Sequence, residues 1–335
     1  MQCTVVIPVI KPNDLLSRIV KNTLLTDKNL KIIIVYNVFS KIIEPSERVE
    51  LLQTTEKNMS SKRNFGVKKS TTEYIAFLDS DAYPDKDWFK SAKKLLEDNS
   101  SIGIITGPEL SFPDQTFIEN TVGICNRSFL ILGSHSFRKS ISKSRFYSEA
   151  SGCNIILKKK DYMQIDGMDP KLYLGEDKEF SHRFVKELKK KIYFSNNVKI
   201  FHKDRGLVGY IVQRYARGLT AVGLIDKIRS FIHEISINNF IKQRFELFMP
   251  FTYIIFLLST PFVYFSKIWM ILFLITNFLY LFIIFIETIR LTKNKFAYFF
   301  PVFIFLIIGS LTPGLAPLFK LLNINMNIKK LYRNS

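Results

Sequence analysis

Strand-like apolar runs alternate with helix-like runs between Thr4 and Thr106, and this alternation constrains the fold more than any other feature of the sequence. The apolar runs are continuous, as expected of strands covered on both faces. They are Thr4–Val9, Leu30–Tyr36, Tyr74–Leu78 and Ile102–Thr106. The helix-like runs are Asn13–Leu25, with Asn13 as N-cap, Ser60–Lys69 and Asp87–Glu97. This order predicts an α/β fold with a doubly wound, mostly parallel sheet.

The next part of the chain is less regular. Strands are expected at Ile155–Leu157, Ile192–Phe194 and Val198–His202, with a helix over Lys178–Leu188. Before them lies the basic stretch Pro113–Arg145, which has no clear period. It is either a solvated basic loop or a surface that contacts phosphate on an acceptor or a lipid.

Two aspartates follow the strand predicted at Tyr74–Leu78, in the run Phe77-Leu78-Asp79-Ser80-Asp81. Ligands of open α/β sheets bind at the carboxyl ends of the strands. Two carboxylates at such a place suit a hard divalent cation, which in turn binds a diphosphate. The pattern is short, and the alternative on its own is an ordinary solvated turn.

The composition changes at about Leu247, where aromatic and β-branched residues begin to dominate. Three apolar blocks follow, each near the roughly 20 residues that cross a bilayer. They are Leu247–Phe265, Ile268–Ile289 and Ala297–Phe319. Three in a row argue against core helices of a soluble protein and predict a multi-pass membrane region. The first and third blocks each contain prolines, so either is a kinked span or a re-entrant segment.

Charge gives a partial orientation. The loop Arg290–Lys295 is basic and is expected in the cytoplasm, like the first domain. The basic tail after Lys320 would lie outside if all three blocks crossed, which suggests that one block does not cross completely. Leu207–Phe248 alternates apolar and basic residues at helical spacing. It is either an interfacial helix on the membrane or, in its first half, an ordinary helix packed on the domain.

These patterns divide the chain into four parts. Residues 1–206 form the α/β domain, 207–246 amphipathic interfacial helices, 247–320 a membrane region with two to three transmembrane helices, and 321–335 a basic tail. The expected location is the cell membrane, with the first domain on the cytoplasmic side.

The net charge of +19 favours anionic partners. Because the basic residues are scattered and form no nucleic-acid-binding module, we expect anionic membrane lipid rather than nucleic acid. Cys3, Cys125 and Cys153 are far apart and odd in number, so they predict no disulfide framework and have no metal-ligand spacing. The N-terminal apolar run is too short for a signal peptide, which favours a first domain that is not exported.

Several short segments occur in an order that resembles the family 2 glycosyltransferases, which have the GT-A fold. They are Val5-Val6-Ile7-Pro8, Lys62-Arg63-Asn64-Phe65-Gly66, Phe77-Leu78-Asp79-Ser80-Asp81, Ser151-Gly152-Cys153-Asn154, Gly167-Met168-Asp169, Gly175-Glu176-Asp177 with Arg183, and His202. The resemblance covers about residues 4–220. Each segment is weak alone, and their order makes the resemblance specific.

The resemblance implies a role for each segment. Asp79 and Asp81 would hold a nucleotide-diphosphate sugar through Mn²⁺ or Mg²⁺, and His202 would approach the same ion. Gly152 and Asn154 would line the pocket for the donor sugar and the acceptor. Nucleotide-sugar binding is implied for Pro8, Asn37, Arg63, Asp79, Asp81, Gly152 and Asn154. Glu176 and Asp177 would be the acidic pair, with Asp177 as the general base.

The chemistry of sugar transfer independently requires such groups. A glycosyl diphosphate leaves as an anion, which a metal ion and arginines stabilise. The acceptor hydroxyl needs a separate carboxylate to take its proton. Each of these residues also has a possible structural role. Glu176 and Asp177 suit a helix N-cap, because acids are favoured in a first turn, His202 suits a structural role, and Arg63 suits the surface of a basic helix.

The chain departs from the family pattern at three places. Tyr36-Asn37 stands where members commonly carry acidic residues that hold the base, although Asn37 still offers hydrogen bonds to a base edge. Asn58 stands in place of the glycine usual before the Arg-Asn pair. Gln213–Gly218 resembles the Gln-x-x-Arg-Trp motif of processive synthases only weakly and has no tryptophan, which favours transfer of one sugar.

Together these features predict a metal-dependent, inverting glycosyltransferase of hexosyltransferase type. It would move a single sugar from a nucleotide-diphosphate sugar to a lipid-linked or membrane-proximal acceptor, in polysaccharide, glycolipid or glycoprotein glycan assembly. One alternative is a polyprenyl-phosphate sugar synthase of the same fold, whose phosphate acceptor needs little deprotonation. Another is a catalytically silent membrane scaffold that binds anionic lipid or a partner glycosyltransferase.

Overall fold

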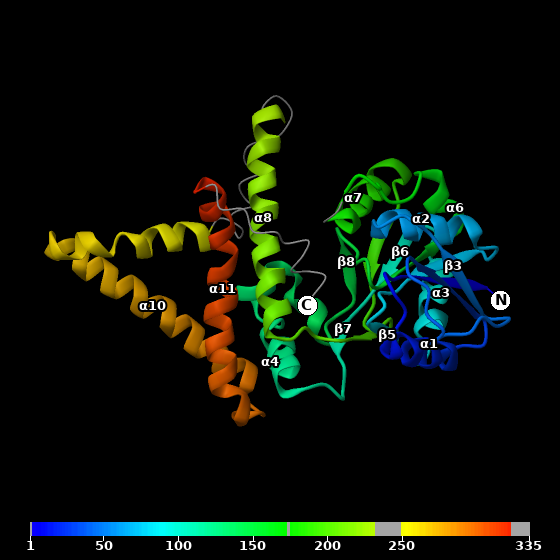
Figure 1. Cartoon of the computed structure of the whole chain (residues 1–335), viewed down its shortest axis with the longest axis horizontal. Coiled ribbons are helices and arrows are strands. Elements are labelled where there is room, and N and C mark those ends of the chain that lie inside the picture. The colour runs from blue at the N-terminus through cyan, green and yellow to red at the C-terminus, as the bar shows by residue number, and fades with distance from the viewer. Residues whose placement is uncertain (1, 173–174, 232–248, 323–335) are drawn as a thin grey trace. The chain divides into compact units, whose positions relative to one another are not determined.

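The computed structural model describes residues 2–172, 175–231 and 249–322, with side chains described up to residue 219 and again from 249. The chain forms two compact units. The sheet unit is Met1–Phe112 with Phe137–Lys203, and the helical unit is Pro113–Ser136 with Asp204–Ser335. Figure 1 shows the elements of both. The predicted domain bounds remain predictions, and the helical unit includes a segment from the middle of the sheet unit that the sequence did not indicate.

A mostly parallel sheet of eight strands forms the centre of the sheet unit, in the order β3-β2-β1-β4-β9-β6-β10-β8. The strands are β1 (Cys3–Pro8), β2 (Leu30–Tyr36), β3 (Val49–Gln53), β4 (Tyr74–Phe77), β6 (Ile102–Thr106), β8 (Arg145–Tyr147), β9 (Ile155–Lys158) and β10 (Lys191–Phe194). Neighbours among β1 to β4 are parallel, as are β6 and β10, whereas β9 and β8 are antiparallel to their neighbours. The predicted fold class, an α/β domain with a mostly parallel sheet followed by helices, is confirmed.

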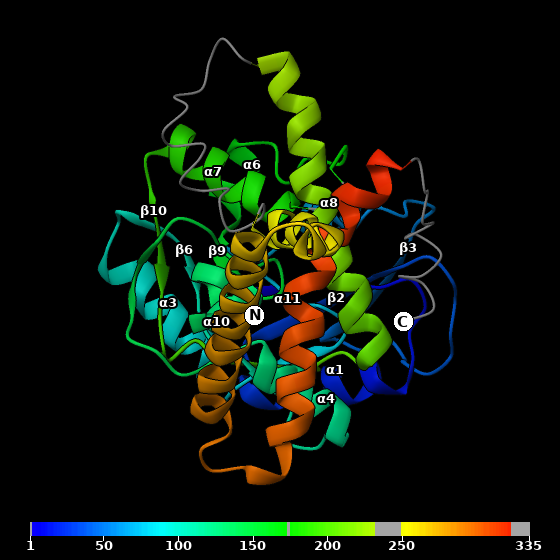
Figure 2. The same cartoon turned by 90° about the vertical axis from the view of Figure 1, so that its left-hand side faces the viewer.

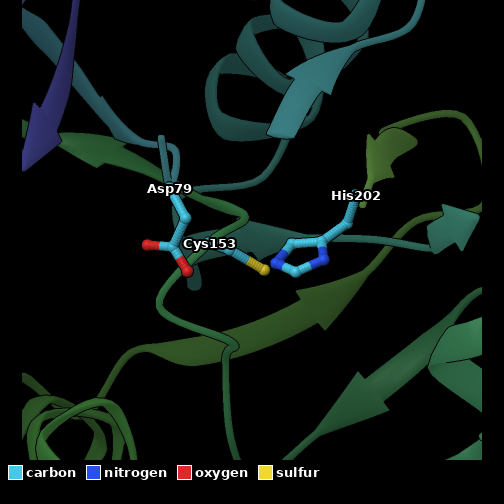
Figure 3. Close-up of side chains that lie close together, drawn as sticks. All are labelled: Asp79, Cys153 and His202. Atoms are coloured by element: carbon cyan, nitrogen blue, oxygen red, sulfur yellow. The ribbon is translucent and has the colours of Figure 1, made fainter. Parts of the chain in front are cut away.

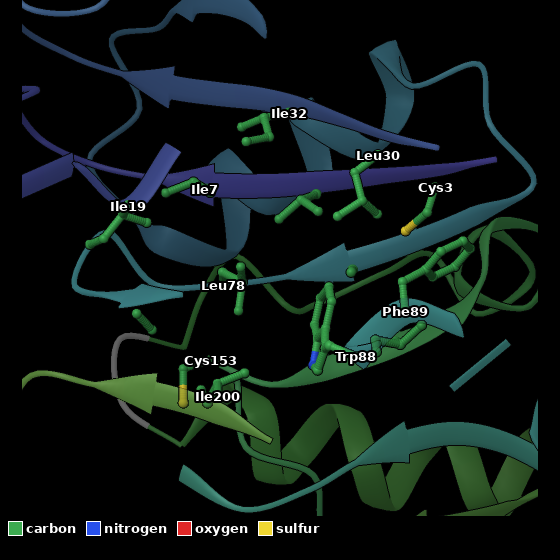
Figure 4. Packing of buried hydrophobic residues seen from close by; sticks show 14 of the residues in the cluster. Cys3, Ile7, Ile19, Leu30, Ile32, Leu78, Trp88, Phe89, Cys153 and Ile200 are labelled. Atoms are coloured by element: carbon green, nitrogen blue, oxygen red, sulfur yellow. The ribbon is translucent and has the colours of Figure 1, made fainter. Parts of the chain in front are cut away.

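Side chains of β1 alternate between two hydrophobic cores because successive residues of a strand point to opposite faces. Val5 and Ile7 belong to the core that α1 (Asp14–Thr26) and α3 (Trp88–Asp98) cover, where Trp88 is fully buried (Figure 4). Val6 belongs to the core on the other face. That face is covered by α2 (Met59–Lys69), α6 (Lys159–Gln164) and α7 (Glu176–Leu188).

The helix and strand positions agree closely with the continuous apolar runs of the sequence. The Asn13 side chain accepts a hydrogen bond from Leu16 N and caps α1, which confirms the predicted N-cap. The strand predicted at Val198–His202 is confirmed as β11 (Ile200–His202), whereas the sequence did not indicate β3 or the other two strands of a second, three-stranded sheet. That sheet has the order β5 (Ala82–Pro84), β11 (Ile200–His202), β7 (Glu109–Ser111).

The segment predicted as an irregular basic stretch, Pro113–Arg145, is partly helical. It contains α4 (Phe117–Cys125), α5 (Phe129–Leu132), the 3-10 helix η1 (Gly133–Lys139) and the first residue of β8. Thr116 and Glu119 form a capping box at the start of α4. Val122 and Ile124 are buried in a core of the helical unit, so α4 is not a solvated loop.

Two long helices, α8 (Leu207–Phe231) and α11 (Phe299–Leu321), pack side by side in the helical unit (Figures 1 and 2). Tyr210 and Arg214 of α8 are buried. Tyr210 donates a hydrogen bond to Phe305 O of α11 at 3.1 Å. The first half of α8 therefore packs as an ordinary helix within the unit, and residues 232–246 of the predicted interfacial region lie outside the described residues.

Two helices are long and apolar enough to cross a membrane, judged by length and composition. They are α10 (Lys267–Thr292) and Phe296–Leu321, which contains the 3-10 helix η3 (Phe296–Tyr298) and α11. The first predicted apolar block contains only the shorter helix Met249–Leu258 and the 3-10 helix η2 (Thr260–Tyr264) among its described residues. This pattern gives weak support for a membrane-associated protein. The predicted tail lies outside the described residues from 323 onward.

Candidate active site

The aspartates of the D-x-D run lie in the short connection between the two sheets. Asp79 follows β4 by two residues, and Asp81 directly precedes β5. Ala82 N donates to Asp79 O at 3.1 Å, which closes a tight turn. Because β11 pairs antiparallel with β5, its last residue, His202, lies opposite Ala82. Strand pairing therefore brings the predicted histidine to the predicted aspartates.

Asp79, Cys153 and His202 form a compact cluster (Figure 3). One ligand atom of each, a carboxylate oxygen, the thiol sulfur and a ring nitrogen, lies within 4.8 Å of the other two. His202 Nε2 is 3.4 Å from Asp81 Oδ1, and His202 Nδ1 is 2.9 Å from Lys203 O. A bond from Nδ1–H to this carbonyl leaves the lone pair of Nε2 directed at the aspartates.

Arg63 links the D-x-D run to the acidic pair. Its guanidinium is buried, with Nη2 at 2.9 Å from Asp79 Oδ1 and Nη1 at 3.1 Å from Glu176 Oε1. Arg63 is therefore not a surface residue of a basic helix. Asn58 positions it, because the Asn58 side chain caps α2 by accepting from Ser60 N and Ser61 N, and also donates to Leu172 O.

Glu176 and Asp177 begin α7, directly after Gly175, which is the N-cap residue with φ of 77°. Asp177 Oδ2 accepts from Gly152 N at 3.1 Å, and Oδ1 accepts from Lys178 N at 2.8 Å. Asp177 thus satisfies one N–H of the first helical turn and also holds the Gly152 backbone. These contacts are compatible with both predictions for Asp177, a residue that caps a helix and a residue of the site.

The site carries more negative than positive charge. Asp79, Glu176 and Asp177 surround the single guanidinium of Arg63, and each raises the pKa of that group, against the opposing effect of burial. Burial, followed by the charge of Asp177, raises the pKa of Glu176 although Arg63 opposes both. The surplus of carboxylates creates a field that favours a bound cation.

Gly152 and Asn154 lie on either side of Cys153 in the loop before β9. A Cβ atom on Gly152 would come within 3.2 Å of Arg63 Nη2, so glycine lets the backbone approach the guanidinium closely. Asn154 is fully buried, accepts from Trp88 Nε1 and donates to Val198 O, each at 2.9 Å. Its predicted contact with a sugar stays a prediction, and these bonds give it a structural role.

Asn37 lies beside a surface depression of about 700 Å³ that is also lined by Gln53, Thr54, Thr55 and Lys57. Both hydrogens of its amide are used, because Nδ2 donates to Thr54 O and Glu56 O at 2.8 Å. The amide oxygen remains as an acceptor at the end of β2. Pro8 is buried at the end of the neighbouring strand β1.

Two features of the site were missed by sequence reasoning. Cys153 belongs to the cluster of potential ligand atoms, and its place within the Ser151–Asn154 segment was the available signal. Glu109 of β7 is buried with Lys139 Nζ at 2.8 Å and Arg138 at 3.9 Å. Arg138 and Lys139 were predicted as part of a basic surface, and no local pattern marks Glu109 as their partner.

Comparison with known proteins gives a family-model match for part of the chain. Residues 4–165 match the model of the family described as Glycosyl transferase family 2. The match supports a glycosyltransferase. It covers slightly less than half of the chain, from β1 through α6, so it includes Asp79 and Asp81 but not Glu176, Asp177 or His202. No curated protein matches the chain.

Solved structures show remote similarity to this chain. Residues 1–349 of TarS from S. aureus align at 13% identity with a TM-score of 0.44, covering 66% of this chain and 65% of that one. GalNAc-T7 in complex with UDP, GalNAc and Mn²⁺ aligns at 13% identity with a TM-score of 0.47, covering 62% of this chain and 44% of that one. The chain spans less than two thirds of either structure, and neither likeness is close enough to carry an argument.

Proposed function

We propose that this chain is an inverting glycosyltransferase that moves a single hexose from a nucleotide-diphosphate sugar to a lipid-linked or membrane-proximal acceptor. The observation that supports this most strongly is the arrangement around Arg63. One carboxylate set, Asp79 and Asp81, lies beside His202, and a second set, Glu176 and Asp177, lies across the guanidinium. Transfer with inversion needs two such sets, because the group that holds the leaving diphosphate cannot also deprotonate the acceptor.

The residues near Asp79 fit a hard divalent cation such as Mn²⁺ or Mg²⁺. Asp79, Asp81 and His202 offer carboxylate oxygens and an imidazole nitrogen in one place. Burial raises the pKa of Cys153, and a neutral thiol is a poor ligand for a hard cation, so we assign the ion to the other three residues. When bound, such an ion supplies positive charge to the departing diphosphate.

Asp177 is the candidate general base. Its carboxylate accepts hydrogen bonds from two backbone N–H groups, those of Gly152 and Lys178, which hold its orientation. Glu176 is committed to Arg63 and is less available to take a proton. Arg63 keeps Asp79 and Glu176 in place and adds positive charge beside the expected position of the diphosphate.

The base of the nucleotide is expected in the depression beside Asn37. Because only the amide oxygen of Asn37 is free to bond, this position accepts a hydrogen bond rather than donating one. Uracil, thymine and guanine offer a ring N–H to such an acceptor, and cytosine and adenine offer an exocyclic amino group.

The setting that we propose is the cell membrane, in assembly of a polysaccharide, glycolipid or glycoprotein glycan. The α/β domain of residues 1–206 would face the cytoplasm, with residues 247–320 in the bilayer and residues 207–246 and 321–335 at its surface. The apolar helices α10 and α11 support this placement, and the net charge of +19 suits a membrane surface of anionic lipid.

Thermal stability of the detergent-purified chain tests this proposal. We expect a rise in Tm with one class of nucleotide sugar, and a larger rise when Mn²⁺ is present. Asp81→Asn should remove the metal-dependent part of the shift. Asp177→Asn should keep nucleotide binding but lower turnover by about 10²–10⁴-fold, the usual contribution of a general base.

The matched control is Asp98→Asn, which removes an exposed carboxylate at the end of α3. It should change neither binding nor turnover. If well-folded protein shows no Tm shift with any nucleotide sugar, the silent-scaffold alternative replaces the proposed activity.

A further inference from the structure

The thiol of Cys153 lies among the residues assigned to the hard divalent cation, but that assignment gives it no role. Its sulfur forms a group with one ligand atom of Asp79 and one of His202, all within 4.8 Å of one another. Figure 3 shows the thiol pointing toward the imidazole ring of His202, with the Asp79 carboxylate beside them. A thiol, an imidazole and a carboxylate in one place are the donor types that hold Zn²⁺ in proteins.

Packing accounts for the burial of Cys153 but not for its position beside these donors. The residue is 5% exposed and belongs to the hydrophobic core that contains Trp88. Cys3 is buried in the same core, but it belongs to no cluster of potential ligand atoms among the described residues. The side chains of Asp79 and His202 are 38% and 18% exposed, so the cluster is open to solvent on their side.

The arrangement is close to what one zinc ion needs. Zinc bonds of about 2.3 Å to sulfur and about 2.0–2.2 Å to nitrogen or oxygen place tetrahedral ligand atoms roughly 3.3–3.7 Å apart. Small movements of the partly exposed Asp79 and His202 side chains would close the set. His202 Nδ1 lies 2.9 Å from Lys203 O, which leaves Nε2 as the ligand atom. Ser151 Oγ lies 3.3 Å from the sulfur, where its hydroxyl can donate to a thiolate.

The thiol makes this cluster respond differently to hard and thiophilic cations. Mn²⁺ and Mg²⁺ prefer oxygen ligands and gain little from sulfur, so they leave Cys153 protonated. Zn²⁺ bonds strongly to thiolate and displaces the thiol proton to solvent. Because Asp79 and His202 would serve both kinds of ion, the two ions compete for one place.

We propose that Cys153, His202 and Asp79 form a zinc site that overlaps the hard-cation site, and that Zn²⁺ inhibits the enzyme by replacing the hard ion. A four-coordinate zinc ion with three protein ligands keeps one open position, too few for two oxygens of a diphosphate. A six-coordinate ion with three protein ligands keeps enough. Zinc binding is independent of sugar transfer, whereas the inhibition deepens the proposed function and rests on it.

Cobalt is the probe, because Co²⁺ occupies zinc sites and a cobalt–thiolate bond gives a charge-transfer band in the near ultraviolet. The full chain in detergent is titrated with Co²⁺ in a reducing buffer free of thiols. We expect the band in the parent protein and its loss when Zn²⁺ is added. Cys153→Ser should abolish the band and weaken Zn²⁺ binding about a hundredfold, as expected for loss of one zinc ligand. It should leave the Mn²⁺ affinity nearly unchanged.

The matched control is Cys3→Ser, which removes a second buried thiol from the same unit and should keep the cobalt band. Absence of the band from the parent protein would overturn the proposal, and this reading does not depend on the folding of a variant. A band that survives in Cys153→Ser, whose folding is checked by its Tm, would also overturn it. Equal losses of Zn²⁺ and Mn²⁺ affinity in that variant would do the same.

Inhibition is measured as loss of the Mn²⁺-dependent Tm shift with nucleotide sugar when Zn²⁺ is added. The parent protein should lose this shift at a Zn²⁺ concentration about a hundredfold lower than Cys153→Ser does. Loss at the same concentration in both proteins would overturn the inhibition. A cobalt–thiolate band without nucleotide-sugar binding would support the zinc site and contradict the proposed transferase function. Nucleotide-sugar binding with Mn²⁺ but without the band would do the reverse.

Discussion

At the scale of single residues, Arg63 connects more of the candidate site than any other side chain described. It is buried and bonds both Asp79 and Glu176. Removing one partner of a buried ion pair typically costs about 3–5 kcal/mol, because the remaining charges lose their compensation. Arg63→Met should therefore lower Tm by about 10 °C. Lys68→Met, at an exposed position of the same helix, is the matched control and should change Tm little. Equal Tm values for the two variants would contradict a central role for Arg63.

Glu109 should make the sheet unit sensitive to acid. Burial would raise the pKa of Glu109, but Lys139 and Arg138 outweigh it and lower the pKa from 4.5 to about 2. A lowered pKa stabilises the fold fully above about pH 4.5, and this stabilisation is lost as the pH falls toward 2. The shift corresponds to about 3 kcal/mol.

The measurement is Tm between pH 7 and pH 3. Glu109→Gln should lower Tm at pH 7 and flatten its decline between pH 5 and pH 3. The exposed Glu44→Gln should follow the parent protein throughout. An unchanged acid decline in Glu109→Gln would show that other carboxylates dominate.

At the scale of elements, the packing of α8 on α11 depends on a close approach at Gly218. A Cβ atom there would lie 2.0 Å from Pro313 O, which is backbone and cannot move aside alone. Gly218→Ala should therefore push the two helices apart and lower Tm in detergent. Gly206→Ala, just before α8, is the matched control because a Cβ atom at Gly206 meets no atom within 4 Å. Equal Tm values for the two variants would show that the helices adjust without strain.

The elements also show how far the sequence predicted the fold and the site. Continuous apolar runs gave β1, β2, β4 and β6, because buried parallel strands need no polar face. The short strands β5, β7 and β8 have no such run and are defined by their partners. The capping box of Thr116 and Glu119 marks the start of α4 in the sequence. The segment was nevertheless predicted to be irregular because of its basic composition. Motif order predicted which residues of the site belong together, but the Glu109 pairs and the buried role of Asn154 depend on contacts distant in sequence.

At the scale of the whole molecule, contacts within the helical unit make a prediction about membrane topology. The Ser128 hydroxyl, just before α5, donates to Glu287 near the end of α10, and Arg290 donates to Arg127 O. The segment with α4 and α5 is joined at both ends to the sheet unit. The end of α10 should therefore lie on the same side of the membrane as the sheet unit, as the basic loop Arg290–Lys295 predicts.

Labelling of single cysteines with an impermeant thiol reagent measures this topology. Asn294→Cys, in the loop after α10, and Lys28→Cys, in the sheet unit, are at exposed positions and should react from the same side. The native cysteines Cys3, Cys125 and Cys153 are buried, so background labelling should be low. Reaction of Asn294→Cys only from the opposite side would exclude this topology.

The chain passes between its two units three times, at Phe112–Pro113, Ser136–Phe137 and Lys203–Asp204. Cys125 of α4 bonds to Val302 O of α11, which lies 177 residues later in the chain. During synthesis, α4 therefore leaves the ribosome long before the helix that covers it. At roughly 5–20 residues per second, the apolar face of α4 stays uncovered for about 10–35 s. A chimera that kept residues 1–203 but replaced the helices after Lys203 would leave that face of α4 permanently uncovered. Residues 1–203 therefore cannot be exchanged as a cassette without the helices that cover α4.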